Sequence, residues 1–250
     1  MKNDFLRKRL LDLAAQSDRT GRFTFTDFLN EAELAEFYAI RSELPACGFT
    51  ISGGYEDAER VMIRFGSEEQ LGYLEPFPIR VLHIAPLQEK FGEQLSHRDI
   101  LGSVMHLGIE RSAVGDILID GKSAYLLCSA DLSDYICSAL ERVKHTSVRC
   151  QITDDLPELV GTHTETQSIQ IASERLDAVI AKVHRISRGS CTELLHTGHV
   201  FINGAAVENG SRLLKEGEKV SVRGKGKFRY LGITGKTKKG NLIAAVDVFV

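Results

Sequence analysis

The 250-residue sequence predicts an α+β protein built from three small domains. Three observations lead to this prediction. The apolar spacing switches repeatedly between a helical period and a strand period along the chain. Residues 73–153 follow the order β-α-β-β-α-β, which is the ferredoxin-like pattern. A polar stretch at 154–172 then separates that region from a basic C-terminal region at 173–250. A chain of this length can hold two or three domains, each with its own core.

The N-terminal region, residues 1–72, is expected to form a small α+β domain. Leucine and phenylalanine residues at helical spacing predict a helix over 4–16. A second helix is expected within 24–41, with Asp27 or Asn30 as its cap. A glycine pair then breaks the helical period, and the residues that follow it read as a strand.

The middle region carries the ferredoxin-like order. Its expected elements are a strand at 79–85, a helix at 97–109, a hairpin at 116–129, a helix at 130–143 and a strand at 147–153. RNA-recognition-motif domains use this topology and stack bases on aromatic residues of the central strands, but many domains with the same topology never touch RNA. Here those strands offer Tyr125, with Arg80 and His83 nearby. The pattern therefore favours the fold more strongly than it favours base stacking.

Residues 154–172 are expected to be a linker with a short entering strand, because they are polar and poorly periodic. Beyond it, a helix over 173–183 is expected with Ser173 as its cap, and a second helix is expected to begin at Ser187. Gly198 is suited to ending that second helix. A hairpin turning at Asn203-Gly204 and a strand at the C-terminal end complete the region.

The charge is divided unevenly along the chain. The net charge is −3, yet residues 174–250 hold 14 Lys and Arg against 7 Asp and Glu, which is a charge of +7. Residues 1–173 hold the other 17 basic and 27 acidic residues, which is a charge of −10. The stretch 221–240 has seven Lys and Arg and no acid. A basic module that binds a polyanion explains this division, and chance surface patterning is the alternative.

Composition and motifs argue against several other classes of protein. No apolar run approaches the roughly 20 residues that cross a bilayer, and the N-terminus has no signal-peptide pattern, so we expect a cytoplasmic protein without membrane contact. The five cysteines are scattered and lack C-x-x-C spacing, which indicates reduced thiols and no structural metal. No Walker loop or dinucleotide-binding motif is present, so no cofactor is expected. We expect a monomer when the protein is free.

Four short motifs of the C-terminal region are similar to the S4 domain of ribosomal proteins. They are RLD (175–177), SR (187–188), LLHTGHVFING (194–204) and EGEKVSV (216–222). The resemblance extends from the first of these motifs to the last and implies a small RNA-binding module of helices and a hairpin. In such a module the second helix presents its N-terminal end to structured RNA. The physics agrees, because the free amides and the dipole at a helix N-terminus favour phosphate.

The order of the motifs along the whole chain resembles the YlmH-type RNA-binding proteins of bacteria and plastids. The N-terminal region contains GGYEDAER, the middle region contains LSHRDILGSVMHLGIERSAVGDI, and the S4-like module follows. The resemblance implies binding to the large ribosomal subunit and a role in ribosome-associated quality control. The implied partners are ribosomal RNA and obstructed subunits that carry peptidyl-tRNA, and an older description of the family concerns cell division.

The resemblance also implies a set of RNA-facing residues. They are Arg175, Ser187, Arg188, Gly189, Ser190, His199, Lys225, Lys227 and Arg229. The second helix departs from the pattern of such domains, since it carries Glu193 and His196 where Lys or Arg is common. Two alternatives stay open: Arg175 could pair with Asp177 or Glu174 on an exposed face instead of RNA, and the lysines at 236, 238 and 239 could form an ordinary solvated loop.

Three hypotheses for function follow from the sequence. The first is a non-enzymatic protein that binds structured ribosomal RNA, and tRNA as well, in translation or quality control. The second is a pseudouridine-synthase-like RNA-modifying enzyme with an unrecognised active site in the N-terminal half of the chain. RLD also resembles the catalytic motif of such enzymes, but it lies within the S4-like module. No nucleophile–base pair can be defended from spacing, so the first hypothesis is preferred. The third is a regulator that binds a protein partner through the acidic N-terminal half.

Overall fold

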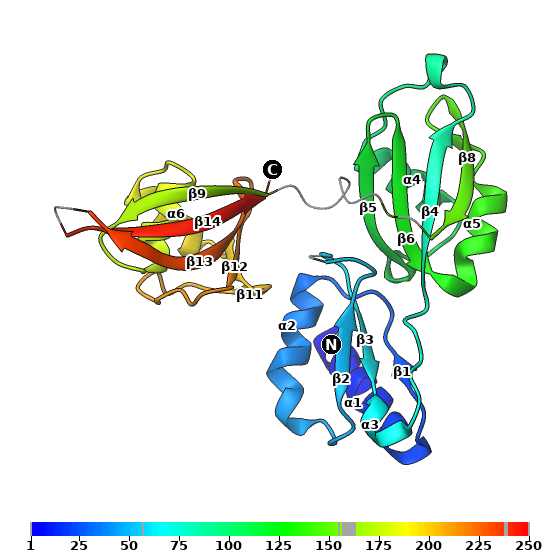
Figure 1. The fold of residues 1–250 in the computed structure, drawn as a ribbon, viewed down its shortest axis with the longest axis horizontal. Helices are drawn as coiled ribbons and strands as arrows, with labels where there is room; N and C mark the ends of the chain where they lie inside the picture. The colour runs from blue at the N-terminus through cyan, green and yellow to red at the C-terminus, as the bar shows by residue number, and fades with distance from the viewer. Residues whose placement is uncertain (1, 57, 155, 157–163, 238–239, 250) are drawn as a thin grey trace. The chain divides into compact units, whose positions relative to one another are not determined.

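The computed structural model describes residues 2–56, 58–154, 156, 164–237 and 240–249 (Figure 1). The chain divides into two compact units, Met1–Gly161 and Thr162–Val250, and each is described by itself below. Helices and strands alternate within both units, which confirms the predicted α+β class. Within the described residues, no helix combines the length and the apolar character needed to cross a membrane.

The N-terminal region forms a three-stranded sheet packed against helices. Its elements are α1 Lys2–Thr20, β1 Thr24–Phe25, α2 Glu31–Ile40, β2 Phe49–Ser52, β3 Met62–Phe65 and α3 Glu68–Leu71, with the strand order β1-β3-β2. Leu10, Phe37 and Phe65 are buried together where α1 and α2 meet the sheet. Asn30, one of the two predicted caps, closes the start of α2 in a capping box with Glu33.

The middle region has the predicted ferredoxin-like order. Its elements are β4 Ile79–Pro86, α4 His97–His106, β5 Val114–Asp120, β6 Ser123–Ser129, α5 Ser133–Ala139, β7 Arg142–Val143 and β8 Thr146–Thr153. The sheet order β5-β6-β4-β8-β7 places β4 and β6 near the centre. The expected helix over 130–143 is shorter than predicted, because β7 forms a tight hairpin with the start of β8.

The GGYEDAER segment ties the N-terminal region to β5. The Tyr55 hydroxyl donates to a carboxylate oxygen of Asp116 at 2.8 Å. The backbone amides of Glu59 and Arg60 donate to the same carboxylate at 2.6 and 3.1 Å. The Arg60 guanidinium donates in turn to the carbonyl of Val114 at 2.8 Å. The residues of this motif that the structure describes therefore act as an internal clamp.

Apolar contacts reinforce the clamp on the helix-free face of the middle sheet. Phe28 and Met62 of the N-terminal region are buried with Leu127 of β6, and Val81 of β4 packs beside them. A side chain on Gly115 would meet the Phe28 ring at 2.7 Å, so only glycine fits at this contact. The N-terminal region thus covers one end of the face that RNA-recognition-motif domains use for bases.

The C-terminal unit is a six-stranded antiparallel sheet with two helices. Its elements are β9 Thr164–Ile171, α6 Leu176–Val183, α7 Arg188–His196, β10 Val200–Ile202, β11 Ala205–Ala206, β12 Lys219–Val222, β13 Gly226–Lys236 and β14 Leu242–Phe249. The order is β11-β10-β12-β13-β14-β9. Val179 of α6 and Leu195 of α7 pack against Val220, Phe228 and Val246, so both helices cover the same face. In Figure 1 the sheet lies in front of the yellow helices.

The C-terminal elements differ from the prediction in the length of one strand and in the cap of one helix. The short entering strand expected within 154–172 is β9, which is longer than expected and pairs with β14 along its whole length. Most of the basic stretch 221–240 is strand β13. The first helix begins at Leu176 and has no side-chain cap, so Ser173 does not cap it. The turn at Asn203-Gly204 is confirmed, with φ values of 48° and 80° that a type I′ turn requires.

Asp116→Ala is expected to destabilise the first unit by about 2 kcal/mol, because two backbone amides and a tyrosine hydroxyl lose their acceptor. Urea unfolding measures the free energy of unfolding, and hydrogen exchange of peptides from β3 and β5 shows where the structure is weakened. Asp120→Ala, at the exposed end of the same strand, is the matched control and should change the free energy of unfolding by less than about 0.5 kcal/mol. Equal effects of the two substitutions would contradict the clamp.

Candidate nucleic-acid interface

The N-terminal end of α7 has the geometry of an anion-binding site. Ser187 is the predicted cap, and its hydroxyl accepts the backbone amide of Ser190 at 3.0 Å. The two hydroxyls of these serines also lie 2.9 Å apart. Arg188 and Gly189 follow the cap and are exposed. The capped first turn therefore points its amides and the positive end of the helix dipole outward, where phosphate binds favourably.

A groove of about 500 Å³ lies beside this helix start. We call it the basic groove, and it is lined by Ile171, Ala172, Ala178, Ala181, Lys182, Arg185, Ile186 and Arg188. Three of these residues are cations and none is an acid. Arg185 has a φ of 53°, a left-handed conformation that turns the chain sharply between the two helices. The groove thus joins three exposed cations with the start of α7, which is an arrangement suited to phosphates.

The N-terminal end of α6 is occupied by the protein's own backbone. Arg175 forms an isolated β-bridge with Leu213. The amide of Leu176 donates to the carbonyl of Arg212 at 2.8 Å, and the amide of Asp177 donates to the carbonyl of Gly210 at 3.0 Å. These bonds replace a side-chain cap, and they explain why the helix begins later than the predicted cap at Ser173.

Arg175 is held by Asp177. Its guanidinium donates to both carboxylate oxygens, at 3.1 and 2.8 Å. The pKa of Asp177 is below its ordinary value of 3.8, chiefly because of these hydrogen bonds, and Arg188 adds a smaller attraction. Of the two alternatives for Arg175, the structure shows the ion pair. A bidentate pair of this kind uses the donors that would otherwise hold a phosphate.

His199 and Lys225 lie at the ends of hairpin strands. The Nδ1 atom of His199 is 2.7 Å from the Thr197 hydroxyl, and the backbone carbonyl of His199 accepts the amide of Arg223. Lys225 is in the turn between β12 and β13, near His184 at the end of α6. Burial and this lysine lower the pKa of His184, whose Nε2 is buried without a partner among the described residues. Lys225 therefore lies near the helical side.

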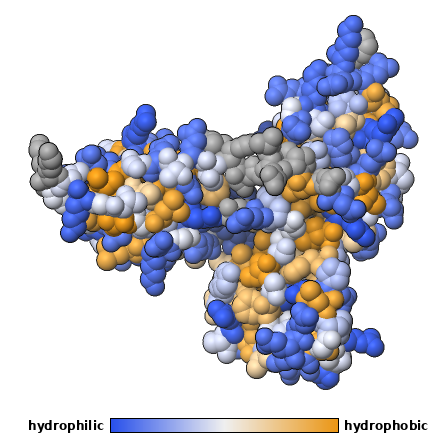
Figure 2. All heavy atoms as spheres, in the orientation of Figure 1, coloured by the Kyte–Doolittle hydropathy of each residue, from blue (hydrophilic) through white to orange (hydrophobic). Residues whose placement is uncertain are grey.

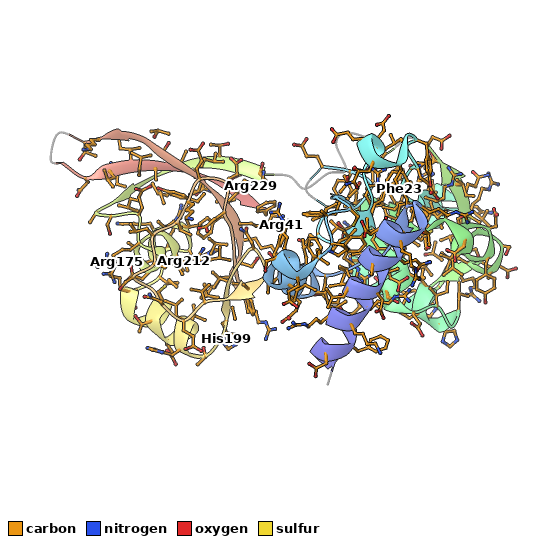
Figure 3. All side chains as sticks on the ribbon, turned by 90° about the horizontal axis from the view of Figure 1, so that it is seen from below. Phe23, Arg41, Arg175, His199, Arg212 and Arg229 are labelled. Carbon is orange, nitrogen blue, oxygen red and sulfur yellow. The ribbon has the colours of Figure 1, made fainter. Side chains whose placement is uncertain are left out.

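Lys227 and Arg229 lie on the other face of the sheet. Their neighbours on β13, Phe228 and Tyr230, are fully buried against the helices. Because strand side chains alternate, the two cations point away from α6 and α7. Figure 3 shows Arg175 and His199 on the helical side of the unit and Arg229 on the sheet. The predicted residues thus divide between two surfaces and do not form one site.

Sequence reasoning missed several cations of these surfaces. Lys182 and Arg185 belong to the basic groove, and their three-residue spacing with Arg188 was the available signal. Lys219 and Arg223 belong to the opposite face, where their ammonium and guanidinium groups lie over aromatic rings. The lysines at 238 and 239, considered as phosphate contacts, lie outside the described residues.

The middle sheet has an aromatic pair on its helix-free face. The rings of His83 on β4 and Tyr125 on β6 stack with centroids 4.9 Å apart. Arg80, on the opposite face of β4, lies 4.0 Å from Asp154 at the edge of ion-pair range. Since the N-terminal region covers the other end of this face, the platform available to bases is small.

Comparisons with known proteins point to one family. Residues 3–70 match the family model described as "YlmH, N-terminal", and residues 74–155 match the model described as "Putative RNA-binding domain in YlmH". The chain is 31% identical over 220 residues to the "Ribosome-associated protein quality control protein P2" of Bacillus subtilis, covering 87% of this chain and 84% of that protein. The solved structure of "Cell division protein ylmH from Streptococcus pneumoniae" is 20% identical, with a TM-score of 0.48, covering 61% of this chain and 92% of that one.

Arg175→Ala is expected to raise the pKa of Asp177 toward 3.8, because the carboxylate loses its two donors. The ionised carboxylate stabilises the fold fully above the unfolded pKa near 3.9, and this contribution disappears as the pH falls through the folded pKa. In the variant the folded and unfolded pKa values of Asp177 nearly coincide, so most of this pH-dependent contribution to stability should be absent at every pH. NMR titration of the Asp177 carboxyl carbon measures this pKa. The control is Arg212→Ala, which leaves the Arg175–Asp177 pair and the pKa of Asp177 unchanged. An unchanged titration in Arg175→Ala would contradict the ion pair.

Proposed function

The chain belongs to the YlmH family, and from this premise we propose that it is a ribosome-associated RNA-binding protein that holds ribosomal RNA of the large subunit through its C-terminal unit. The observation that carries the proposal is the basic groove, in which Lys182, Arg185 and Arg188 meet at the capped start of α7. Phosphate contacts of this kind dominate affinity for RNA. The ribosomal assignment is supported by the name of the Bacillus subtilis relative.

The proposed biological role is ribosome-associated quality control in the cytoplasm. The Bacillus subtilis relative is named for that process, and it aligns with most of both chains. We propose tRNA as a second partner, contacted by the first unit. The stacked rings of His83 and Tyr125 support this, because RNA-binding sheets hold unpaired bases on aromatic side chains.

We propose that the chain acts by binding and does not catalyse a reaction on RNA. The residue that most resembles a catalytic carboxylate is Asp177 of the RLD motif, and it is buried and engaged by Arg175. A survey of modified nucleosides in ribosomal RNA and tRNA, from cells with and without this protein, tests the proposal. Unchanged profiles support it, and a modification that disappears with the protein contradicts it.

Arg185→Ala combined with Arg188→Ala is expected to weaken binding to large ribosomal subunits by at least about tenfold at physiological salt. Each lost phosphate contact should also reduce the slope of log affinity against log salt by about 1. Co-sedimentation of the full chain with purified subunits at several salt concentrations measures both quantities.

The control for this pair is Arg19→Ala combined with Arg22→Ala. These arginines are exposed in the first unit, so the control removes the same charge by the same chemistry. It should leave the affinity within about threefold of the original. If the groove variant still co-sediments as the unaltered chain does, or if both pairs weaken binding equally, the basic groove is not the site.

A further inference from the structure

We infer that the C-terminal unit has a second nucleic-acid surface, on the face of its sheet opposite the helices, which takes unpaired nucleotides of RNA. We call it the sheet face. It is formed by Phe201, Lys219, Arg223, Lys227, Arg229 and Phe249. The inference rests on the proposed function, because it requires that the C-terminal unit binds RNA. It extends that function by assigning a separate surface to a different form of RNA.

The strand register brings these residues together. Val220, Phe228 and Val246 are fully buried under the helices, so their alternate neighbours on the same strands face the other way. Phe201 pairs with Ser221, and Ser221 pairs with Lys227. The next strand continues this row with Phe249, since Val248 pairs with Phe228. The two phenylalanines are thus three strand spacings apart, about 14 Å.

Cations lie over both aromatic rings of the sheet face. The guanidinium carbon of Arg223 is 5.2 Å from the centroid of the Phe201 ring. The ammonium of Lys219 lies 5.2 Å from the centroid of Phe249, and the guanidinium carbon of Arg229 lies 5.9 Å from it. Such pairs fix the long side chains in place, so less rotamer freedom is lost when a ligand binds.

The combination of charge and rings favours RNA over other partners. Four cations share this face with one carboxylate of the described strands, Asp247, which lies directly across from Arg229 and also accepts the Thr166 hydroxyl at 2.6 Å. The face therefore keeps an excess of positive charge. A positive face favours a polyanion. Guanidinium planes and aromatic rings stack nucleobases, and a base is available for stacking only where it is unpaired. An acidic protein segment would use the charges but would gain nothing from the planar groups.

The two surfaces cannot hold the same nucleotides. The basic groove includes residues of α6 and the start of α7, and the sheet separates these helices from the sheet face. Figure 2, in the orientation of Figure 1, shows blue and orange residues mixed over the sheet side of this unit. One domain would therefore contact two segments of RNA, one through its phosphates in the groove and one through its bases on the sheet.

The test uses the full chain with two labelled RNAs of equal length, an oligouridine and a stable hairpin closed by a short loop. Lys219→Ala with Arg223→Ala should weaken oligouridine binding about tenfold and hairpin binding by less than about threefold. Arg223→Lys keeps the charge but removes the planar guanidinium group, and Phe201→Leu removes the aromatic ring over which that group lies. Each should weaken oligouridine binding about threefold without changing the salt slope, which a loss of charge alone would change.

Thermal melting of each variant checks that the fold is retained. If Phe201→Leu fails to fold, the test still rests on Arg223→Lys, because that change is exposed and preserves the charge. The matched control is Lys8→Ala with Arg22→Ala, two exposed cations of the first unit. If this control weakens oligouridine binding equally, or if Arg223→Lys behaves as the unaltered chain, the inference is wrong. Binding of polyglutamate, which stands for an acidic protein segment, is measured with the same variants. The inference is also wrong if the sheet-face variants lose only the binding of polyglutamate, because that result would indicate an acidic protein partner.

The basic-groove pair, Arg185→Ala with Arg188→Ala, is measured in the same series. It should weaken hairpin binding more than oligouridine binding. If it has no effect while the sheet-face variants do, the sheet face is supported and the proposed groove fails. If the groove variant alone has an effect, the proposed function stands and the second surface is rejected.

Discussion

The alternation of side chains along β12, β13 and β14 is the constraint on which the C-terminal unit depends. Every second residue at the centre of these strands is packed against α6 and α7, and Phe228, Tyr230 and Val246 are fully buried there. The register that buries them sends Lys227 and Arg229 to the opposite face. A shift of one residue would bury these cations, so the core and the charge pattern are specified together.

This constraint also explains why the function of the basic residues cannot be judged from their number. The C-terminal part of the chain from Glu174 onward has a charge of +7, but its cations are distributed between a groove beside the helices and a face behind them. Charges on opposite sides of a sheet act on different ligands. Arg175, at the start of α6, is engaged by Asp177 and contributes less than its position in the RLD motif implies.

Much of the fold could be predicted from the sequence, because the signals were local. The cap at Ser187, the turn at Asn203-Gly204 and the ferredoxin-like order of the middle region all follow from spacing and turn chemistry. The length of strand β9 was underestimated, because its polar residues obscure the apolar alternation of a strand and its pairing partner is the last strand of the chain. The start of α6 was misplaced, because carbonyls of a distant loop replace its cap.

The site was predicted less well, since it depends on which residues the fold brings together. Nothing in the sequence indicates that Asp116 of β5 accepts three donors from the GGYEDAER segment. The regular spacing of Lys182, Arg185 and Arg188 is a signal, but spacing alone does not show that the three share a groove. The kind of ligand could be predicted from the sequence, because the basic residues at the start of one helix and along one strand are visible in it directly. The division into two faces required the strand register.

The most direct test of RNA binding through the C-terminal unit is ultraviolet crosslinking of the full chain to ribosomes in cells, with mass spectrometry of the RNA-linked peptides. The account predicts crosslinks in peptides that contain residues 182–190 and 219–229, on the two faces of that unit. Crosslinks confined to the first unit, Met1–Gly161, would contradict it.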